Sequence, residues 1–164
     1  MDNTRIDWAD MTWNPVTGCR NGCPYCYARG ITKRFGGHLM PLFDKGVVVL
    51  DEPDYLMEGE RKVRISPYPF DFVPTFHRYR LDQPERKKRP QNIFVCSMAD
   101  LFGEWVPTRW IVEVLDACMA APQHNYLFLT KNPERYVQLD EMALLPRRNN
   151  FWYGTAATKE GDPY

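Results

Sequence analysis

The stretch TGCRNGCPYCYARG, residues 17–30, carries three of the five cysteines in this chain. Cys19, Cys23 and Cys26 follow a C-x3-C-x2-C spacing, and an aromatic residue, Tyr25, directly precedes the last of them. The N-terminus shows no apolar leader, and no apolar run approaches the ~18 residues of a membrane span. We therefore expect a cytoplasmic protein without a membrane partner. In a reducing cytosol, a close cysteine cluster indicates metal binding or catalysis rather than disulfides.

The composition limits both the size of the fold and the kind of partner. With 164 residues, of which 44% are hydrophobic, the chain can bury one ordinary core, and we expect a single domain over residues 1–164. Lys plus Arg and Asp plus Glu each number 21, so the net charge is zero. A neutral chain creates no overall field that attracts nucleic acid, membranes or acidic ligands. Any such affinity has to come from a local patch.

Outside one central segment, apolar strands alternate with amphipathic helices. Strands are expected at residues 12–13, 93–96, 125–131 and 149–158, and helices at residues 26–37, 107–121 and 132–145. In the middle helix, the apolar residues recur at helical spacing as Trp110, Ile111, Val114, Leu115 and Cys118. The strands at 93–96 and 125–131 read as continuous apolar runs of the fully buried type. This alternation predicts an α/β fold with a parallel sheet and outer helices, either open or barrel-like.

The central segment, residues 38–90, is rich in proline and breaks the alternation. It contains an apolar run at residues 46–50 and a strand-like stretch at residues 61–66. We expect an insertion that carries a small hairpin.

In parallel sheets of this kind, ligands bind at the carboxyl ends of the strands. The cysteine loop follows the first expected strand, and Ser97 and Asp100 follow the second. Lys131 ends the third strand, and Thr155 lies near the end of the fourth. We expect these residues to line one mouth.

The number of cysteines distinguishes two kinds of metal site. A structural zinc usually takes four ligands from two separated pairs. Here there is one triplet, and the candidates for a fourth ligand, His38, His77, Cys96 and Cys118, lack a matching spacing. A [4Fe–4S] cluster on three cysteines leaves one iron open to a ligand from outside the protein. The spacing favours the cluster; a non-catalytic zinc module, with nucleic acid as its ligand, is the alternative.

The motif C-x3-C-x-(aromatic)-C on the loop after the first strand resembles the signature of the radical S-adenosylmethionine (SAM) superfamily. Four blocks look like the phage-associated radical SAM family of unknown substrate: residues 12–28, 77–107, 127–136 and 151–158. The resemblance implies a partial (βα) barrel in which Cys19, Cys23 and Cys26 hold a [4Fe–4S] cluster. It also implies that the open iron binds SAM, and that an electron from a flavodoxin or ferredoxin cleaves SAM to a 5′-deoxyadenosyl radical that attacks the substrate.

The SAM contacts depart from the superfamily pattern. Ser97 and Asp100 stand where members usually carry two glycines of a Gly-Gly-Glu motif. We expect Asp100 beside the SAM ammonium, because charge-assisted hydrogen bonds are the strong ones. From their positions at strand ends, we expect Lys131 beside the SAM carboxylate or a substrate anion and Thr155 among the cofactor contacts. Ser97 and Asp100 have a structural alternative, which is to cap the next helix or brace the loop, and Lys131 has the alternative of an ordinary surface lysine. Cys96 and Cys118 are expected in the core.

Two further features bear on partners and completeness. The basic run at residues 85–90, with Arg78 and Arg80 upstream and Phe76 and Tyr79 nearby, offers a phosphate-binding surface, although such runs are usually solvated. Four strand–helix units fall short of the eight of a full barrel. We therefore expect an incomplete barrel whose last strand has an unpaired edge.

Overall fold

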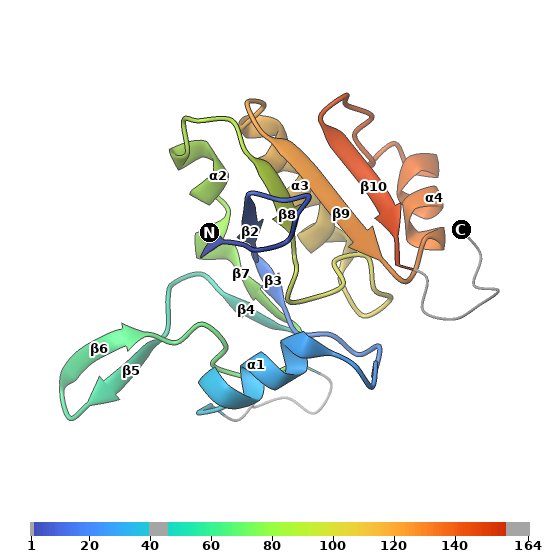
Figure 1. Ribbon diagram of the computed structural model, residues 1–164. Helices are drawn as coiled ribbons and strands as arrows, with labels where there is room; N and C mark the ends of the chain where they lie inside the picture. Colours follow the sequence, from blue (N-terminus) through green and yellow to red (C-terminus); the bar gives the residue numbers. More distant parts are fainter. Residues whose placement is uncertain (1, 40–45, 157–164) are drawn as a thin grey trace.

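The chain folds around a five-stranded sheet with the strand order β1-β2-β8-β9-β10 (Figure 1). The computed structural model describes residues 2–39 and 46–156. The four parallel strands are β2 (Met11–Trp13), β8 (Asn92–Val95), β9 (Asn125–Thr130) and β10 (Phe151–Thr155). At one edge the short β1 (Asp2–Asn3) pairs antiparallel with β2. The prediction of a parallel sheet is confirmed; over the described residues the sheet is open. Residues 157 and 158 of the last predicted strand lie outside this range.

One face of the sheet forms the core with the helices. Met11, Ile93, Tyr126 and Phe151 occupy facing positions on the four parallel strands, and all four are buried. The helix α3 (Thr108–Ala120) packs there with all five residues predicted for its apolar side buried, and α4 (Glu134–Glu141) adds Leu139. The helical spacing in the sequence was therefore sufficient to identify the inner side of α3.

The opposite face of the sheet is only partly covered. Burial alternates along β8 and β9, so Phe94 and Leu129 are half-buried while their neighbours are fully buried. The apolar runs had indicated strands buried on both faces, and this prediction is wrong. Helices cover one face, and the other faces a cavity.

The predicted insertion, residues 38–90, contains a hairpin and also contributes strands that pack in the core. Its hairpin joins β5 (Tyr55–Glu58) to β6 (Arg61–Ile65), which confirms that expectation. The strands β4 (Val48–Leu50) and β7 (Thr75–His77) instead join β3 (Val16–Thr17) in a separate three-stranded sheet. Phe76 on β7 is fully buried in the main core, so this part of the segment is integral to the fold.

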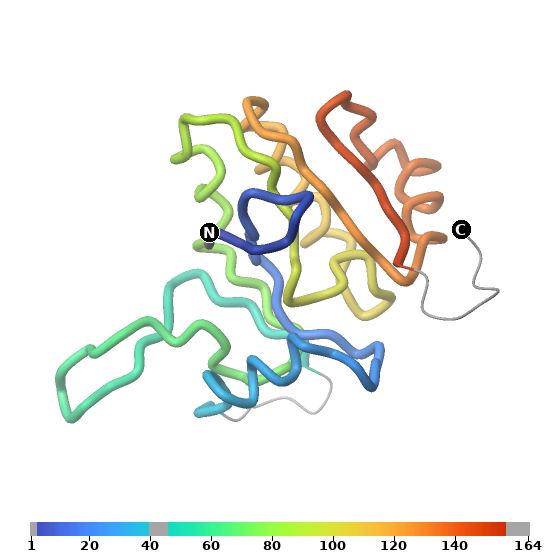
Figure 2. The backbone as a smooth tube through the Cα atoms, in the orientation of Figure 1, coloured from blue at the N-terminus to red at the C-terminus, as the bar shows by residue number. Residues whose placement is uncertain are grey.

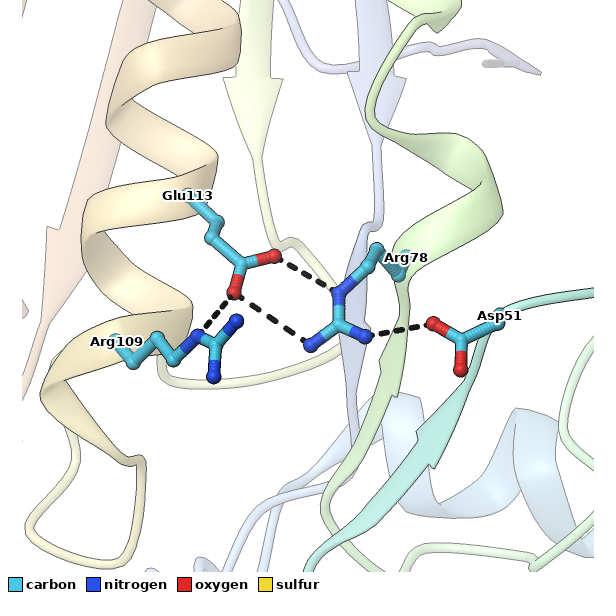
Figure 3. Close-up of polar contacts among 4 residues, drawn as sticks. All are labelled: Asp51, Arg78, Arg109 and Glu113. Carbon is cyan, nitrogen blue, oxygen red and sulfur yellow. Dashed lines mark hydrogen bonds and ion pairs between the residues drawn. The ribbon is translucent and has the colours of Figure 1, made fainter.

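An ion-pair network joins this segment to α3 (Figure 3). After β7 the chain forms a 3-10 turn (Arg78–Arg80) and the short α2 (Gln83–Arg86). Arg78 bonds Glu113 through Nε at 2.9 Å and Asp51 through Nη1 at 2.6 Å. Arg80 donates to the backbone oxygens of Asn14 and Pro67. Both arginines thus make contacts within the protein, the basic run at residues 85–90 is exposed, and phosphate binding there stays a prediction.

The helix ends follow local chemistry. The helix α1 (Tyr27–Phe35) begins after Cys26, whose side chain accepts a bond from the Arg29 N–H, and it ends at Gly36 as predicted. The helix α4 begins after Pro133, and the side chain of the preceding Asn132 donates to the Phe102 carbonyl at 3.1 Å. Within the described residues, no helix has both the length and the apolar character needed to cross a membrane.

Gly18 fixes the start of the cysteine loop. Its N–H donates to the Met98 carbonyl at 2.9 Å, and its φ of +84° lies in the left-handed region. A Cβ there would come within 2.4 Å of the Val73 carbonyl oxygen, which is backbone. Gly22, in the same loop, also has a positive φ of +66°, but a Cβ there would meet nothing within 4 Å.

We predict that Gly18→Ala lowers the free energy of unfolding by about 3 kcal/mol or more, since backbone strain and a backbone collision add. Gly22→Ala is the matched control, because it carries the strain without the collision, and should cost about 1–2 kcal/mol. Urea denaturation of both variants checks the difference. Equal costs would show that β7 and the preceding loop are not packed against Gly18 as described.

Candidate functional site

A cavity of about 800 Å³ opens at the carboxyl ends of β2, β8 and β9. Its polar lining comes from segments that follow these strands, including Asn14, Ser97, Asp100 and Lys131. The volume lies within the range of small-molecule sites in proteins. A cavity therefore lies where the strand ends were predicted to form a binding site, on the sheet face that the helices do not cover.

The three clustered cysteines all line this cavity. Cys19, Cys23 and Cys26 are free thiols and half-buried. Cys96 and Cys118 lie in the core away from it, which confirms their predicted role. Burial raises the pKa of Cys96 to about 12 and the pKa of Cys118 well above its ordinary value, so both remain neutral thiols. The fold separates three available sulfurs from two unreactive ones.

Backbone N–H groups point at two of the cavity sulfurs. Cys19 Sγ accepts from the Asn21 N–H at 3.5 Å, and Cys26 Sγ accepts from the Arg29 N–H at 3.4 Å at the start of α1. Such donors and a helix N-terminus favour a thiolate. Burial nevertheless raises the pKa of Cys19 to about 11, against the weaker opposing effect of the Asn21 bond. The free Cys19 is a neutral thiol, and a metal that binds it has to displace the proton.

The carboxylate of Asp100 is the centre of the polar network. Oδ2 accepts from the side chain of Asn21 at 3.0 Å and from the N–H of Lys131 at 3.0 Å. Oδ1 accepts from the hydroxyl of Thr130 at 2.7 Å and from the N–H of Phe102 at 3.2 Å. Asp100 is 95% buried, with 5% of its surface exposed, and it ties the cysteine loop to the end of β9. In this structure Asp100 braces the loop, and its contact with SAM stays a prediction.

The other three predicted SAM contacts differ in position. Ser97 lines the cavity, and its hydroxyl donates to the side-chain oxygen of Asn14 at 3.2 Å. Lys131 also lines it, with Nζ 3.2 Å from the hydroxyl of Tyr25 and 5.6 Å from the centre of that ring. Thr155 pairs with Thr130 in the sheet and is not among the lining residues, whereas the next residue, Ala156, is.

Several lining residues had no signal in the sequence. Arg5 and Trp8 come from the N-terminal loop, which passes in front of the sheet (Figure 1), and Trp8 packs edge-on against Phe94 with ring centres 4.9 Å apart. This contact joins residues far apart in the chain, so no local pattern indicates it. Phe94 and Leu129 could have been identified, because strand alternation places them opposite the core residues.

The possible metal ligands in the cavity lining are the three clustered thiols and the carboxylate of Asp100. In the described part of the chain, no three His, Cys, Asp or Glu side chains come together as ligands of one metal ion. A zinc ion needs its ligand atoms around one centre, whereas a cubane binds each thiolate on a different iron. The cavity lining contains neither a histidine nor a fourth cysteine. The three clustered thiols therefore share one cavity without forming a site for a single ion among the described residues.

A small apolar cluster packs against two of the three clustered cysteines. Ala28, Phe72 and Met98 are buried together, and Cys19 and Cys26 pack against them. An apolar surround limits access of water to a metal centre and tunes its redox potential. The lining is therefore polar at the strand ends and apolar around the thiols.

We predict that Asp100→Asn lowers the free energy of unfolding by about 2–3 kcal/mol, because the new NH₂ group faces donors in place of an acceptor. Asp116→Asn, the same change at an exposed site on α3, should leave stability unchanged. Urea denaturation of both variants makes the comparison. Unchanged stability of the Asp100 variant would mean that these donors do not hold the carboxylate, and would favour its direct role in ligand binding.

Comparisons with known proteins place the chain in a family without assigning an activity. Neither the search of curated proteins nor the search of solved structures returned a match to this chain. A family model does match it, over residues 3–162. The chain therefore belongs to the family described as "Protein of unknown function (DUF5131)".

Proposed function

We propose that this chain is a radical SAM protein in which Cys19, Cys23 and Cys26 hold a [4Fe–4S] cluster. The observation that carries the proposal is that all three thiols line one cavity at the carboxyl ends of parallel strands. Because the lining offers no fourth cysteine or histidine, one iron would be left for SAM. When bound, the cluster and SAM supply the one-electron cleavage of SAM to methionine and a 5′-deoxyadenosyl radical, which removes hydrogen from the substrate.

The residues of the chain have distinct tasks in this proposal. Asn21 and Asp100 hold the cysteine loop in place, and the start of α1 donates to Cys26. Phe72 and Met98 keep water from the sulfurs. At the mouth, Lys131 presents a cation suited to the SAM carboxylate or to an anionic substrate. In the proposal, Ser97 and Asp100 contact the SAM amino group. This contact requires that each side chain has hydrogen-bonding capacity beyond its bonds to the protein.

The architecture suits a partial barrel. The four parallel strands have helices on one face and the cavity on the other, as the wall of a (βα) barrel has. The substrate would enter from the open side, and a flavodoxin or ferredoxin would supply the electron. The partial barrel and the electron donor belong to the proposal, which is based on the three clustered cysteines.

We predict that Cys19→Ala, Cys23→Ala and Cys26→Ala each abolish iron binding, since a cubane on three thiolates has none to spare. Anaerobic reconstitution followed by iron analysis measures this, and chromatography measures 5′-deoxyadenosine formed from SAM with dithionite. Cys118→Ala is the matched control, because it removes a thiol from the core, and it should keep both iron and product. Normal iron content in Cys23→Ala would refute the ligand assignment.

A further inference from the structure

The charges of this neutral chain are segregated along its sequence. Residues 11–43 contain no Asp or Glu, although the whole chain has 21 acidic residues. The same stretch carries Arg20, Arg29, Lys33 and Arg34. Arg20, Lys33 and Arg34 are exposed, and Arg29 lies over the ring of Phe72 at 4.7 Å. The cysteine loop and α1 thus form a purely basic surface.

The β5–β6 hairpin adds three cations, next to two carboxylates, Glu58 at the end of β5 and Glu60 in the turn. Arg61, Lys62 and Arg64 lie on β6, which is exposed along its whole length. Figure 2 shows the hairpin extending away from the body of the protein, at the same end as α1. The two strands form a sheet of their own that projects as a two-stranded ribbon.

Among the described residues these cations form no ion pair, although Glu58 lies opposite Arg61 across the hairpin. Elsewhere in the described chain Arg78, Arg109 and Arg147 pair with carboxylates. No ion pair between described residues involves the cations of the cysteine loop, α1 or β6. Their positive charge is therefore available to a ligand.

Polar contacts join the two basic segments into one surface. His38, just after α1, bonds Asp54 through Nε2 at 2.8 Å and Ser66 through Nδ1 at 3.2 Å. Asp54 directly precedes β5 and Ser66 directly follows β6, so the base of the hairpin is fixed beside the end of α1. We call the seven cations of this surface the basic rim: Arg20, Arg29, Lys33, Arg34, Arg61, Lys62 and Arg64. The helix and the ribbon together extend over roughly 30 Å.

The basic rim leads to the cavity. Tyr27 and Ile31 line the cavity from α1, and Arg34 lies on the same helical face one turn further on. Tyr25 and Tyr27 are 64% and 58% exposed at the mouth. Exposed aromatic rings among unpaired cations are the usual platform for bases beside a phosphate backbone.

We infer that the basic rim binds the phosphate backbone of a nucleic acid, so that the substrate of the proposed reaction is a nucleotide within a strand; this rests on the proposed function. The ribbon favours a nucleic acid over an acidic protein, because the major groove admits a two-stranded β-ribbon and an extended polyanion follows a line of cations. Chemistry on a base requires that the nucleotide leave the stack. The cavity beside the exposed tyrosines would receive it.

The test is binding of labelled 20-nucleotide DNA and RNA single strands, the DNA duplex and a polyglutamate, measured by fluorescence anisotropy at several salt concentrations. The rim variant is Arg61→Gln, Lys62→Gln and Arg64→Gln combined. The matched control, Arg86→Gln, Lys88→Gln and Arg89→Gln combined, removes the same three charges from the exposed run near α2. We expect the rim variant to bind nucleic acid at least tenfold more weakly, and its salt slope on the duplex to fall by about 0.9 per cation removed. The control should keep the affinity and slope of the unchanged chain.

A second variant guards against misfolding of the hairpin. Arg20→Gln combined with Lys33→Gln leaves the hairpin intact and should lower the duplex salt slope by about 1.8. Equal losses in rim and control variants, no binding of any oligonucleotide at low salt, or polyglutamate binding as tight as that of the strands would overturn the inference. The assay needs no cluster, and iron content is measured on the same samples. Failure of nucleic-acid binding with normal iron content therefore refutes this inference alone. Absence of iron with normal binding refutes the proposed function and, with it, the assignment of a nucleotide as substrate, while the binding surface itself stands.

Discussion

The carboxylate of Asp100 is the contact on which the candidate site depends. It lies on the loop after β8 and accepts hydrogen bonds from the cysteine loop, through Asn21, and from the end of β9, through Thr130 and the Lys131 N–H. A buried carboxylate is costly unless donors saturate it, so its burial requires these three segments to stay together. One ionised group thereby fixes the distance between the cysteine loop and the strand ends, and the cavity exists because that distance is held.

Within this frame the surroundings of the thiols determine their chemistry. The fold withdraws Cys96 and Cys118 into the core and leaves the clustered cysteines on a cavity wall with a small apolar cluster packed against two of them. Burial raises the pKa of Cys19, so this thiol is neutral in the free protein, and backbone N–H donors already point at the sulfurs of Cys19 and Cys26. These surroundings suit a metal centre protected from water and reached from one side, where the basic rim begins.

The structure could be predicted from the sequence where it depends on neighbouring residues. Helical spacing identified all the buried positions of α3, and the glycine at Gly36 marked the end of α1. The sequence was insufficient where the structure depends on distant residues. The pairing of Val16 with Phe76 and the contact of Trp8 with Phe94 join segments about 60 or more residues apart. The position of Asp100 suggested a ligand, but its distant donors come from two other parts of the chain, the cysteine loop and the end of β9, and only the folded structure reveals them.

The metal content of the protein after anaerobic reconstitution tests the central claim most directly, because it depends on the three cysteines and on no assumption about the substrate. Iron, acid-labile sulfide and zinc are measured on one sample of known protein concentration. The proposed function predicts a brown protein with about four iron and four sulfide per chain. Stoichiometric zinc without sulfide, or a colourless protein without iron, would contradict it and would favour the zinc-binding alternative or a site that binds no metal.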